Sequence, residues 1–215
     1  MALRVCCVLL ACLATAPWLH AAVLTVRIAN SRGAAVADAV VSVTPHDGAA
    51  PAHAAVQKII DQKNETFLPY VETFHPGDSV VFRNSDQTRH HVYSFAPARQ
   101  FEFVLTPGQS SAPLRLEHAG AIAVGCNIHD HMITYLYVAD APWLLRSGED
   151  GRAELADLPP GDYDVRIWHP QLRPGQSGPQ QAVHIVGADD HQDLAFTLSL
   201  LPDPRRAVDR ERADY

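Results

Sequence analysis

A short segment beyond the middle of the chain carries three side chains of the kinds that bind metal ions. Cys126, His129 and Met132 offer a thiolate, an imidazole and a thioether, and the two sulfur atoms belong to residues only six positions apart. Thiolate and thioether are soft ligands that favour Cu(I), while imidazole suits both oxidation states of copper. The residue types and their spacing therefore predict a copper site on this segment.

A complete site of this kind needs a second imidazole from elsewhere in the chain. Copper electron-transfer sites place two His and one Cys in a trigonal plane, with a weak axial Met. We expect His90 to supply the missing ligand, because it opens a strand directly after a polar loop. Its neighbour His91 is the alternative, and only one should face the metal because adjacent strand residues point to opposite faces. His131 is the alternative to His129. It directly precedes Met132, however, and the side chains of two neighbouring residues diverge on an extended backbone.

The first 22 residues predict a secretory signal peptide. Arg4 supplies a positive charge, residues 5–19 are mostly apolar, and His20-Ala21-Ala22 offers small residues for cleavage. We therefore expect the mature chain in the periplasm, with no stable membrane span after cleavage. An uncleaved anchor is one alternative, although the apolar run is short for a membrane span, and a lipid on Cys12 is another.

Removal of that segment would change the cysteine content of the protein. Cys6, Cys7 and Cys12 lie in the signal peptide, which leaves Cys126 without an internal disulfide partner in a compartment that oxidises thiols. An odd cysteine outside the cell is a free thiol, half of an intermolecular bridge or a metal ligand. Met132 is the only methionine besides the initiator. The closeness of these two sulfur side chains favours the ligand interpretation.

The bulk composition limits the remaining function classes. The 215 residues carry a formal net charge of −7 and 47% of them are hydrophobic, which is typical of a globular protein. Lys and Arg are scattered rather than gathered into a basic stripe, so we expect no nucleic-acid partner. Proline is frequent, and Val, Thr and aromatic residues recur in short runs. This composition predicts many short strands and an all-β fold.

Apolar runs bounded by turn residues locate the strands. The expected strands, in chain order, are 23–30, 39–44, 56–61, 67–74, 79–83, 90–95, 101–105, 114–116, 120–125, 133–139, 165–168, 182–186 and 194–200. Residues 46–55 are rich in Ala and Gly and indicate a linker. His75 and His118 each lie beside turn residues, and we expect both at the surface.

Residues 56–139 resemble a cupredoxin of the plastocyanin and amicyanin kind. Val80-Val81-Phe82-Arg83-Asn84 followed by His90 is similar to the strand that precedes the first His ligand of plastocyanin, and Cys126-x-x-His129-x-x-Met132 is similar to the short ligand loop of amicyanin. The chain also resembles bacterial plastocyanin-like proteins often labelled methylamine utilisation proteins. The resemblance implies a Greek-key β-sandwich that holds one copper ion through His90, Cys126, His129 and Met132.

Four features depart from the pattern of these families. Gly125 stands where they carry a bulkier residue, and Asn127-Ile128 replaces a segment that usually has Pro before the second His. His91 stands where plastocyanin has Asn, and His131 adds an imidazole near the loop. Extra imidazoles would change the ligand set and hence the spectrum more than the choice of metal.

The flanks resemble the two halves of another fold. Residues 23–46 and 140–200 are similar to a carboxypeptidase-regulatory-like, transthyretin-like β-sandwich, with markers at Ala39-Val40-Val41-Ser42-Val43 and at Asp150-Gly151-Arg152. We therefore expect the cupredoxin to be inserted in or fused to a small sandwich, with a disordered tail over 201–215. One enlarged sandwich with extra strands is the alternative.

Three functions remain in competition at this stage. The first is a carrier of single electrons that uses a type 1 copper site and docks redox partner proteins near the copper loop, without being an enzyme. The second is a copper-binding or copper-delivery protein, which the extra imidazoles His91 and His131 keep open. The third is a metal-free carbohydrate- or peptide-binding sandwich, in which the cluster of His, Cys and Met would be accidental.

Overall fold

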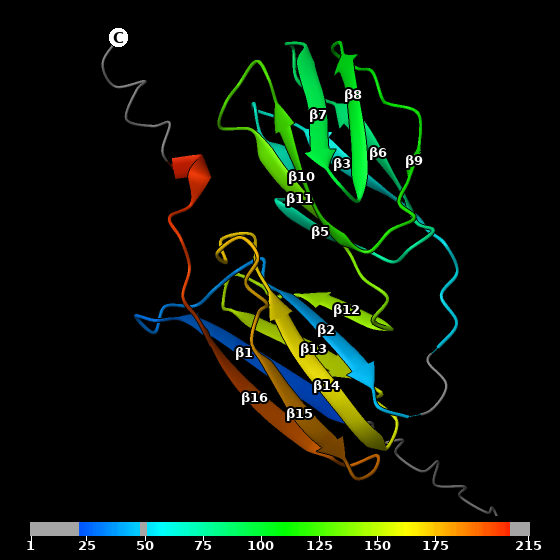
Figure 1. Ribbon diagram of the computed structural model, residues 1–215, viewed down its shortest axis with the longest axis vertical. Helices are drawn as coiled ribbons and strands as arrows, with labels where there is room; N and C mark the ends of the chain where they lie inside the picture. The colour runs from blue at the N-terminus through cyan, green and yellow to red at the C-terminus, as the bar shows by residue number, and fades with distance from the viewer. Residues whose placement is uncertain (1–21, 48–50, 207–215) are drawn as a thin grey trace, which may run out of the picture.

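The computed structural model describes residues 22–47 and 51–206, and nearly all of its regular structure is strand (Figure 1). Sixteen strands and a single 3₁₀ turn make up the regular structure of the described residues. The prediction of an all-β fold is confirmed. The expected signal peptide lies outside the described residues except for Ala22, and the first strand begins at Val23.

Strands from both ends of the chain form one unit, which we call the flanking sandwich. Its strands are β1 (Val23–Asn30), β2 (Val40–Pro45), β12 (Trp143–Arg146), β13 (Arg152–Ala156), β14 (Gly161–Trp168), β15 (Gln180–Ile185) and β16 (His191–Leu198). They form a three-stranded sheet in the order β13-β1-β16 and a four-stranded sheet in the order β12-β2-β14-β15. Leu24, Val41, Val43, Val165 and Ile185, all fully buried, lie in the core between these sheets.

The middle of the chain forms a second unit, the inserted sandwich. Its strands are β3 (Gln57–Gln62), β4 (Phe67–Leu68), β5 (Val71–Phe74), β6 (Ser79–Asn84), β7 (His90–Ala96), β8 (Arg99–Leu105), β9 (Leu114–Arg115), β10 (Gly120–Cys126) and β11 (Ile133–Val138). They form sheets in the orders β5-β11-β10-β7-β8 and β4-β3-β6-β9. A separate apolar core, with Phe74, Phe82, Ile122 and Leu136 fully buried, fills the space between these two sheets.

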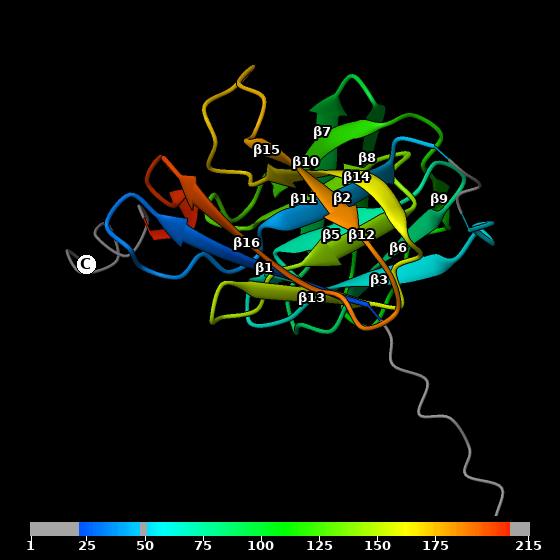
Figure 2. The same ribbon diagram turned by 90° about the horizontal axis from the view of Figure 1, so that it is seen from below.

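The strand pairing explains how one unit sits within the other. β1 pairs in parallel with β16, from Val23 beside His191 to Asn30 beside Leu198. β2 pairs with both β12 and β14. The flanking sandwich is therefore built from chain segments on either side of the inserted one, and the two units lie one above the other in Figure 1 and overlap in the end view of Figure 2.

Three elements differ from the sequence-based expectation, and one of them is β13, which was not among the expected strands. The expected strand over 67–74 is divided at Pro69, so that β4 pairs with β3 in one sheet and β5 pairs with β11 in the other. Proline has no backbone N–H to donate to a ladder, which suits it to this crossing between sheets. β12 was not expected, because its residues are all at least partly exposed and show no alternation between buried and exposed positions.

Aromatic side chains join the two sandwiches. The Trp168 ring at the end of β14 stacks on Tyr137 of β11, with ring centroids 4.7 Å apart, and meets Tyr135 edge-on. Arg146 of β12 donates hydrogen bonds to Asp38 and to the Val71 carbonyl oxygen. These contacts from different strands hold the inserted sandwich against one sheet of the flanking sandwich.

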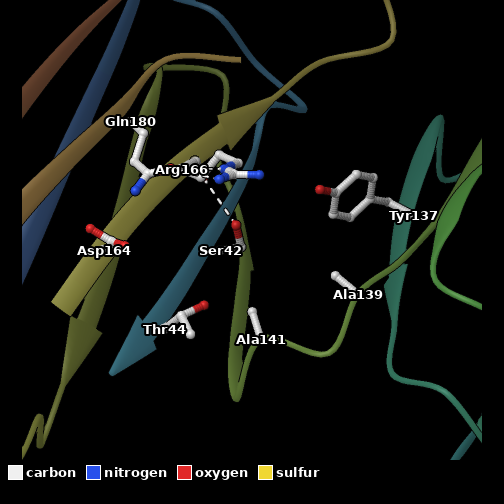
Figure 3. A pocket seen from close by; sticks show the side chains of 8 residues that line it. All are labelled: Ser42, Thr44, Tyr137, Ala139, Ala141, Asp164, Arg166 and Gln180. Atoms are coloured by element: carbon white, nitrogen blue, oxygen red, sulfur yellow. Dashed lines mark hydrogen bonds between the residues drawn. The ribbon is translucent and has the colours of Figure 1, made fainter. Parts of the chain in front are cut away.

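A cleft of about 270 Å³ opens beside this aromatic contact. Figure 3 shows Ser42 and Arg166 on β2 and β14 at one side and Tyr137 at the other. The Ser42 hydroxyl donates to the Arg166 carbonyl oxygen at 3.3 Å, so part of the polar lining is satisfied within the flanking sandwich.

The end of the described chain packs against both units. The 3₁₀ turn Pro204–Arg206 places the Arg205 guanidinium 3.5 Å from the centroid of the Tyr70 ring, and Arg205 also pairs with Asp203. The segment expected to be disordered from residue 201 therefore begins with a packed turn, while residues 207–215 lie outside the described part. No helix within residues 22–47 and 51–206 is long and apolar enough to cross a membrane.

Candidate metal centre

The loop that carries Cys126, His129 and Met132 connects two paired strands. β10 ends at Cys126 and β11 begins at Ile133, with Gly125 paired to Ile133. The Cys126 amide donates to the Met132 carbonyl oxygen at 3.2 Å, and the Met132 amide donates to the His129 carbonyl oxygen at 3.0 Å. The loop is thus closed on itself by backbone hydrogen bonds, which bring the backbones of Cys126 and Met132 together.

A third strand brings His90 to the same place. β7 pairs antiparallel with β10, so that Val92 lies beside Cys126, and the Asn127 amide donates to the His91 carbonyl oxygen. His90 is fully buried. Its side chain lies on the same face of β7 as that of Val92, which belongs to the apolar core of the inserted sandwich.

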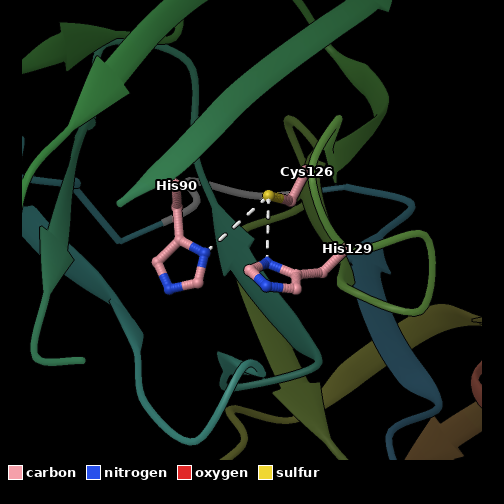
Figure 4. A group of neighbouring side chains, drawn as sticks. All are labelled: His90, Cys126 and His129. Atoms are coloured by element: carbon pink, nitrogen blue, oxygen red, sulfur yellow. Dashed lines mark hydrogen bonds between the residues drawn. The ribbon is translucent and has the colours of Figure 1, made fainter. Parts of the chain in front are cut away.

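Both imidazoles present the same ring nitrogen to the thiol. In Figure 4 the Cys126 Sγ atom lies 3.8 Å from His90 Nδ1 and 3.9 Å from His129 Nδ1. Metal bonds of about 2.3 Å to sulfur and about 2.0 Å to nitrogen place the two donors about 3.7 Å apart in a trigonal plane, and about 3.5 Å apart in a tetrahedron. The observed separations are close to these values, so one ion could contact the thiol and both imidazoles, as a copper site of this ligand set requires.

Met132 lies in the apolar core of the inserted sandwich. It is 1% exposed and packs among the buried apolar residues of the inserted sandwich, together with Cys126. Its position next to Cys126 follows from the backbone hydrogen bond that joins the two residues. Its thioether belongs to the same apolar core as the Cys126 thiol.

Carboxylates stand behind the far nitrogen of each imidazole. His90 Nε2 donates to Asp86 Oδ2 at 2.8 Å, and His129 Nε2 lies 3.6 Å from Glu65 Oε1. A carboxylate ion only accepts hydrogen bonds, so Asp86 fixes the proton of His90 on Nε2 and leaves the Nδ1 lone pair directed at Cys126. Carboxylate partners of this kind orient metal-binding imidazoles and raise their basicity.

The Asp86 carboxylate also organises the turn that carries Glu65. Burial alone would raise the pKa of Asp86, but hydrogen bonds from the Glu65 amide, His90 Nε2 and the Asn64 amide outweigh it and hold the pKa below its usual range. Asn64 and Glu65 both have positive φ angles, 55° and 52°, in the turn between β3 and β4. By accepting both amides of this turn, Asp86 ties the positions of the two carboxylates together.

The competing imidazoles are not part of this donor cluster. His91 Nε2 is 2.8 Å from Glu102 Oε1 of β8, on the opposite face of β7 from His90. The ring centroid of His131 is 6.1 Å from that of His129. Within the described residues, the donor cluster at this end of the sandwich contains His90, Cys126 and His129 and neither alternative.

Two further residues bear on the family pattern, Gly125 as a departure from it and Asn84 as a match to it. A Cβ atom at Gly125 would lie 3.1 Å from the Tyr93 hydroxyl oxygen and 3.2 Å from its ring, so the Tyr93 side chain occupies the space that a bulkier residue would need. Asn84 is fully buried and donates to the carbonyl oxygens of Thr88 and Leu105. It thereby fixes the loop that leads to His90.

Sequence reasoning missed Asp86, Glu65 and Tyr93. A signal for Asp86 was present, since it lies four residues before His90 in the loop that follows Asn84, and its amide donates to Asn84 Oδ1. Glu65 and Tyr93 gave no comparable signal, because they reach the site through a turn between other strands and through cross-strand pairing.

Comparison with known proteins gives structural neighbours only. No family model matches the chain, and no curated protein matches it in sequence. Among solved structures, amicyanin from Paracoccus versutus is 20% identical, with a TM-score of 0.35 over 46% of this chain and 98% of its own. The purple cupredoxin from Nitrosopumilus maritimus is 20% identical, with a TM-score of 0.34 over 39% of this chain and 99% of its own.

A copper-containing nitrite reductase from Thermus scotoductus is also similar to part of the chain. It is 21% identical, with a TM-score of 0.35 over 45% of this chain and 25% of its own. The neighbours thus include amicyanin, a purple cupredoxin and a copper-containing nitrite reductase, each similar to less than half of this chain. The case for a metal at this site stands on the donors themselves.

Proposed function

We propose that the inserted sandwich binds one copper ion through His90, Cys126, His129 and Met132 and carries single electrons in the periplasm. One observation supports this above all others. Two imidazole Nδ1 atoms lie 3.8 and 3.9 Å from one buried thiol, near the separation of about 3.7 Å expected for ligands of one trigonal copper ion. Bound copper would supply the one-electron redox couple.

The surrounding residues would keep the site the same in both oxidation states. Asp86 holds the proton of His90 on Nε2, so the Nδ1 lone pair is available without rotation of the ring. Cys126 is 3% exposed and Met132 1% exposed, which keeps water from the sulfur ligands. A donor set that moves little on a change of charge favours fast electron transfer.

We further propose that partner proteins dock around the loop between β10 and β11. The His129 side chain is 17% exposed, which gives the cluster its route to the surface. Ile128 beside it is 46% exposed and offers an apolar contact. A small apolar surface around a partly exposed ligand suits brief contacts with a redox partner.

The same donor count argues for a carrier rather than an enzyme. One thiolate, two imidazoles and one thioether complete a four-coordinate site from protein side chains alone. A catalytic metal needs a position that substrate or water can occupy. We therefore propose that no substrate reacts at this copper.

Copper delivery is the second candidate, and one observation favours it. His131 is partly exposed, and its ring centroid lies 6.1 Å from that of His129. An imidazole so close to the edge of the site could receive copper from it. A delivery protein would exchange its metal readily, whereas a carrier would retain it.

The decisive experiment loads the mature protein with Cu(II) and records its visible and EPR spectra. Intense thiolate-to-copper absorption with small hyperfine splitting is expected for the carrier. His131→Gln is the matched control, and we expect it to keep both signals. Pale copper that a chelator removes within minutes supports delivery. An unchanged spectrum and stoichiometry in Cys126→Ser would overturn the copper assignment, and recovery of the protein outside the osmotic-shock fraction would overturn the proposed location.

A further inference from the structure

A second cluster of metal-binding side chains lies at the other end of the inserted sandwich. It contains His53, His75 and Asp78, whose donor atoms all lie within 4.8 Å of one another. Val138 at the end of β11 pairs with Phe74, directly before His75, while the start of β11 adjoins the Cys126 loop. The length of β11 therefore separates the two clusters, by about 17 Å at the usual rise per residue.

The Asp78 carboxylate forms the buried centre of this cluster. Its side chain is 1% exposed. The Val56 amide and His53 Nε2 lie 2.8 and 2.7 Å from Oδ1, and the His75 amide donates to Oδ2 at 2.8 Å. Burial alone would raise the pKa of Asp78, but these hydrogen bonds outweigh it and lower the pKa. The cluster therefore holds a buried anion.

The hydrogen bonding of His75 leaves a lone pair directed at this anion. His75 Nε2 lies 3.0 Å from the Ala141 carbonyl oxygen, which can only accept, so Nε2 carries the proton. In the neutral ring Nδ1 is then unprotonated, and it lies 3.9 Å from Asp78 Oδ2. Two electron-rich atoms face each other across a gap too wide for a hydrogen bond. A cation between them would be bound by both.

The third donor of such a site would be His53. The His53 ring centroid is 4.0 Å from that of His75, and the His53 side chain is 33% exposed. His53 lies on residues 51–56, which form no strand. His53 could exchange its hydrogen bond to Asp78 for a bond to the metal. The 2.7 Å contact between His53 Nε2 and Asp78 Oδ1 identifies Nε2 as the atom that must shift.

We propose that His53, His75 and Asp78 bind a divalent transition-metal ion of the zinc class. Two imidazole nitrogens and one carboxylate oxygen, with no sulfur, form a donor set that suits Zn²⁺, Ni²⁺ or Cu²⁺ rather than Cu(I). The cluster shares no residue with the Cys126 site. The proposal therefore stands or fails independently of the copper function.

The position of the cluster indicates a structural role for this ion. His53 lies on the segment that enters the inserted sandwich, and Ala141 lies on the segment that leaves it. His75 and Asp78 belong to the turn between β5 and β6, where both crossings meet. A metal bound here would fasten the entry segment to the turn and so limit movement of the inserted sandwich relative to the flanking one.

The test is calorimetric titration with Zn²⁺ in a Cys126→Ser/His129→Gln background, which removes two donors of the other cluster. We expect one Zn²⁺ per chain and a higher melting temperature with the ion bound. Adding His53→Gln should weaken Zn²⁺ binding by more than about 100-fold, the upper range for loss of a mere outer partner. His118→Gln, at an exposed loop position, is the matched control and should change nothing.

Two results would overturn the proposal. One is the absence of Zn²⁺ binding up to millimolar concentration, with circular dichroism unchanged from the unmodified protein. The other is binding that His53→Gln leaves intact. Imidazole ¹⁵N chemical shifts add an independent readout, because a metal bound to His75 Nδ1 shifts the resonance of that nitrogen. A protonated Nδ1 whose resonance does not change on addition of Zn²⁺ would contradict the site.

Discussion

The two ends of the inserted sandwich each gather two imidazoles around one buried side chain, a thiol at one end and a carboxylate at the other, and the contacts of that side chain differ. At one end the Cys126 thiol has only the two Nδ1 atoms of His90 and His129 within 3.9 Å among the polar contacts that the described structure shows for it. At the other end Asp78 already accepts three hydrogen bonds within 2.8 Å. We therefore expect the first cluster to bind a metal without giving up a hydrogen bond, whereas the second would have to exchange one.

The difference lies in how the strands support each cluster. Strands β7, β10 and β11 fix the first cluster, and Asp86 and Glu65 support its imidazoles from behind. The second cluster takes one of its imidazoles from a segment that forms no strand. We therefore expect tight, Cu(I)-compatible binding at the first cluster and weaker binding of divalent ions, more sensitive to pH, at the second.

Cys126→Asp is the most direct way to break this comparison, because it gives the first cluster the donor types of the second. We expect Cu(I) affinity to fall by more than about 100-fold, beyond the usual cost of losing an outer partner, because carboxylate is a hard ligand. Divalent binding should persist. Competition with a Cu(I)-specific chelator measures the change, and Cu(I) affinity retained in the variant would contradict the role of the thiolate.

His169 tests what burial does to an imidazole outside both clusters. It is 4% exposed, and burial lowers its pKa to about 4, far below the ordinary 6.5. Between these values the unfolded chain binds a proton that the folded protein does not, so stability decreases as the pH falls from about 6.5 to about 4. The loss approaches about 3 kcal/mol.

Urea unfolding at pH 7.5 and pH 4.5 measures this effect. His169→Asn should remove this part of the pH dependence. His184→Asn is the control, because His184 is an exposed imidazole that pairs with Asp162. Equal pH dependence in the unmodified protein and in His169→Asn would show that His169 is not the group responsible.

Asp86→Asn sharpens the comparison by weakening the support of the first cluster alone. An amide can present its NH₂ to His90 Nε2, which disturbs the tautomer that directs Nδ1 to Cys126. Copper affinity should fall by about 10- to 100-fold, and Zn²⁺ binding at the second cluster should not change. Asp162→Asn serves as the exposed control. A normal copper affinity with an unaltered spectrum would remove Asp86 from the site.

Gly125→Ala has the smallest expected effect. Its Cβ would lie 3.1 Å from the Tyr93 hydroxyl oxygen, so the ring must shift, at a cost of about 1 kcal/mol in unfolding free energy. Adding Tyr93→Ala opens that space and should make the Gly125 substitution nearly neutral. A double-mutant cycle from urea unfolding measures the coupling, and strict additivity would show that Tyr93 does not limit this position.

More of the first cluster than of the second could be predicted from the sequence, and the reason is physical. Cys126, His129 and Met132 share one loop, and strand alternation separates His90 from His91, so local rules suffice. His53, His75 and Asp78 meet only because β3 pairs in parallel with β6, which places the start of one beside the start of the other. His75 was expected at the surface, yet its side chain is 20% exposed and bonded to Ala141, a contact made by the exit segment.

Some of the fold was equally beyond local patterns. The division of the expected strand at Pro69 depends on which sheet each half joins, and β12 is defined by its pairing with β2 rather than by its own alternation. The backing of His129 by Glu65 depends on a turn more than sixty residues away in sequence. Tertiary pairing decides such features, and periodicity along one segment does not report it.

The parallel pairing of β1 with β16 has a consequence for the order in which the protein folds. β1 is the first described strand, yet its partner runs from His191 to Leu198 near the end of the chain. The inserted sandwich, by contrast, has all of its strands once Val138 has emerged. Contacts close in sequence form before distant ones. A chain that emerges from its N-terminus can therefore assemble the Cys126 cluster while β1 is still unpaired with β16. Metal could enter the protein before its scaffold is closed.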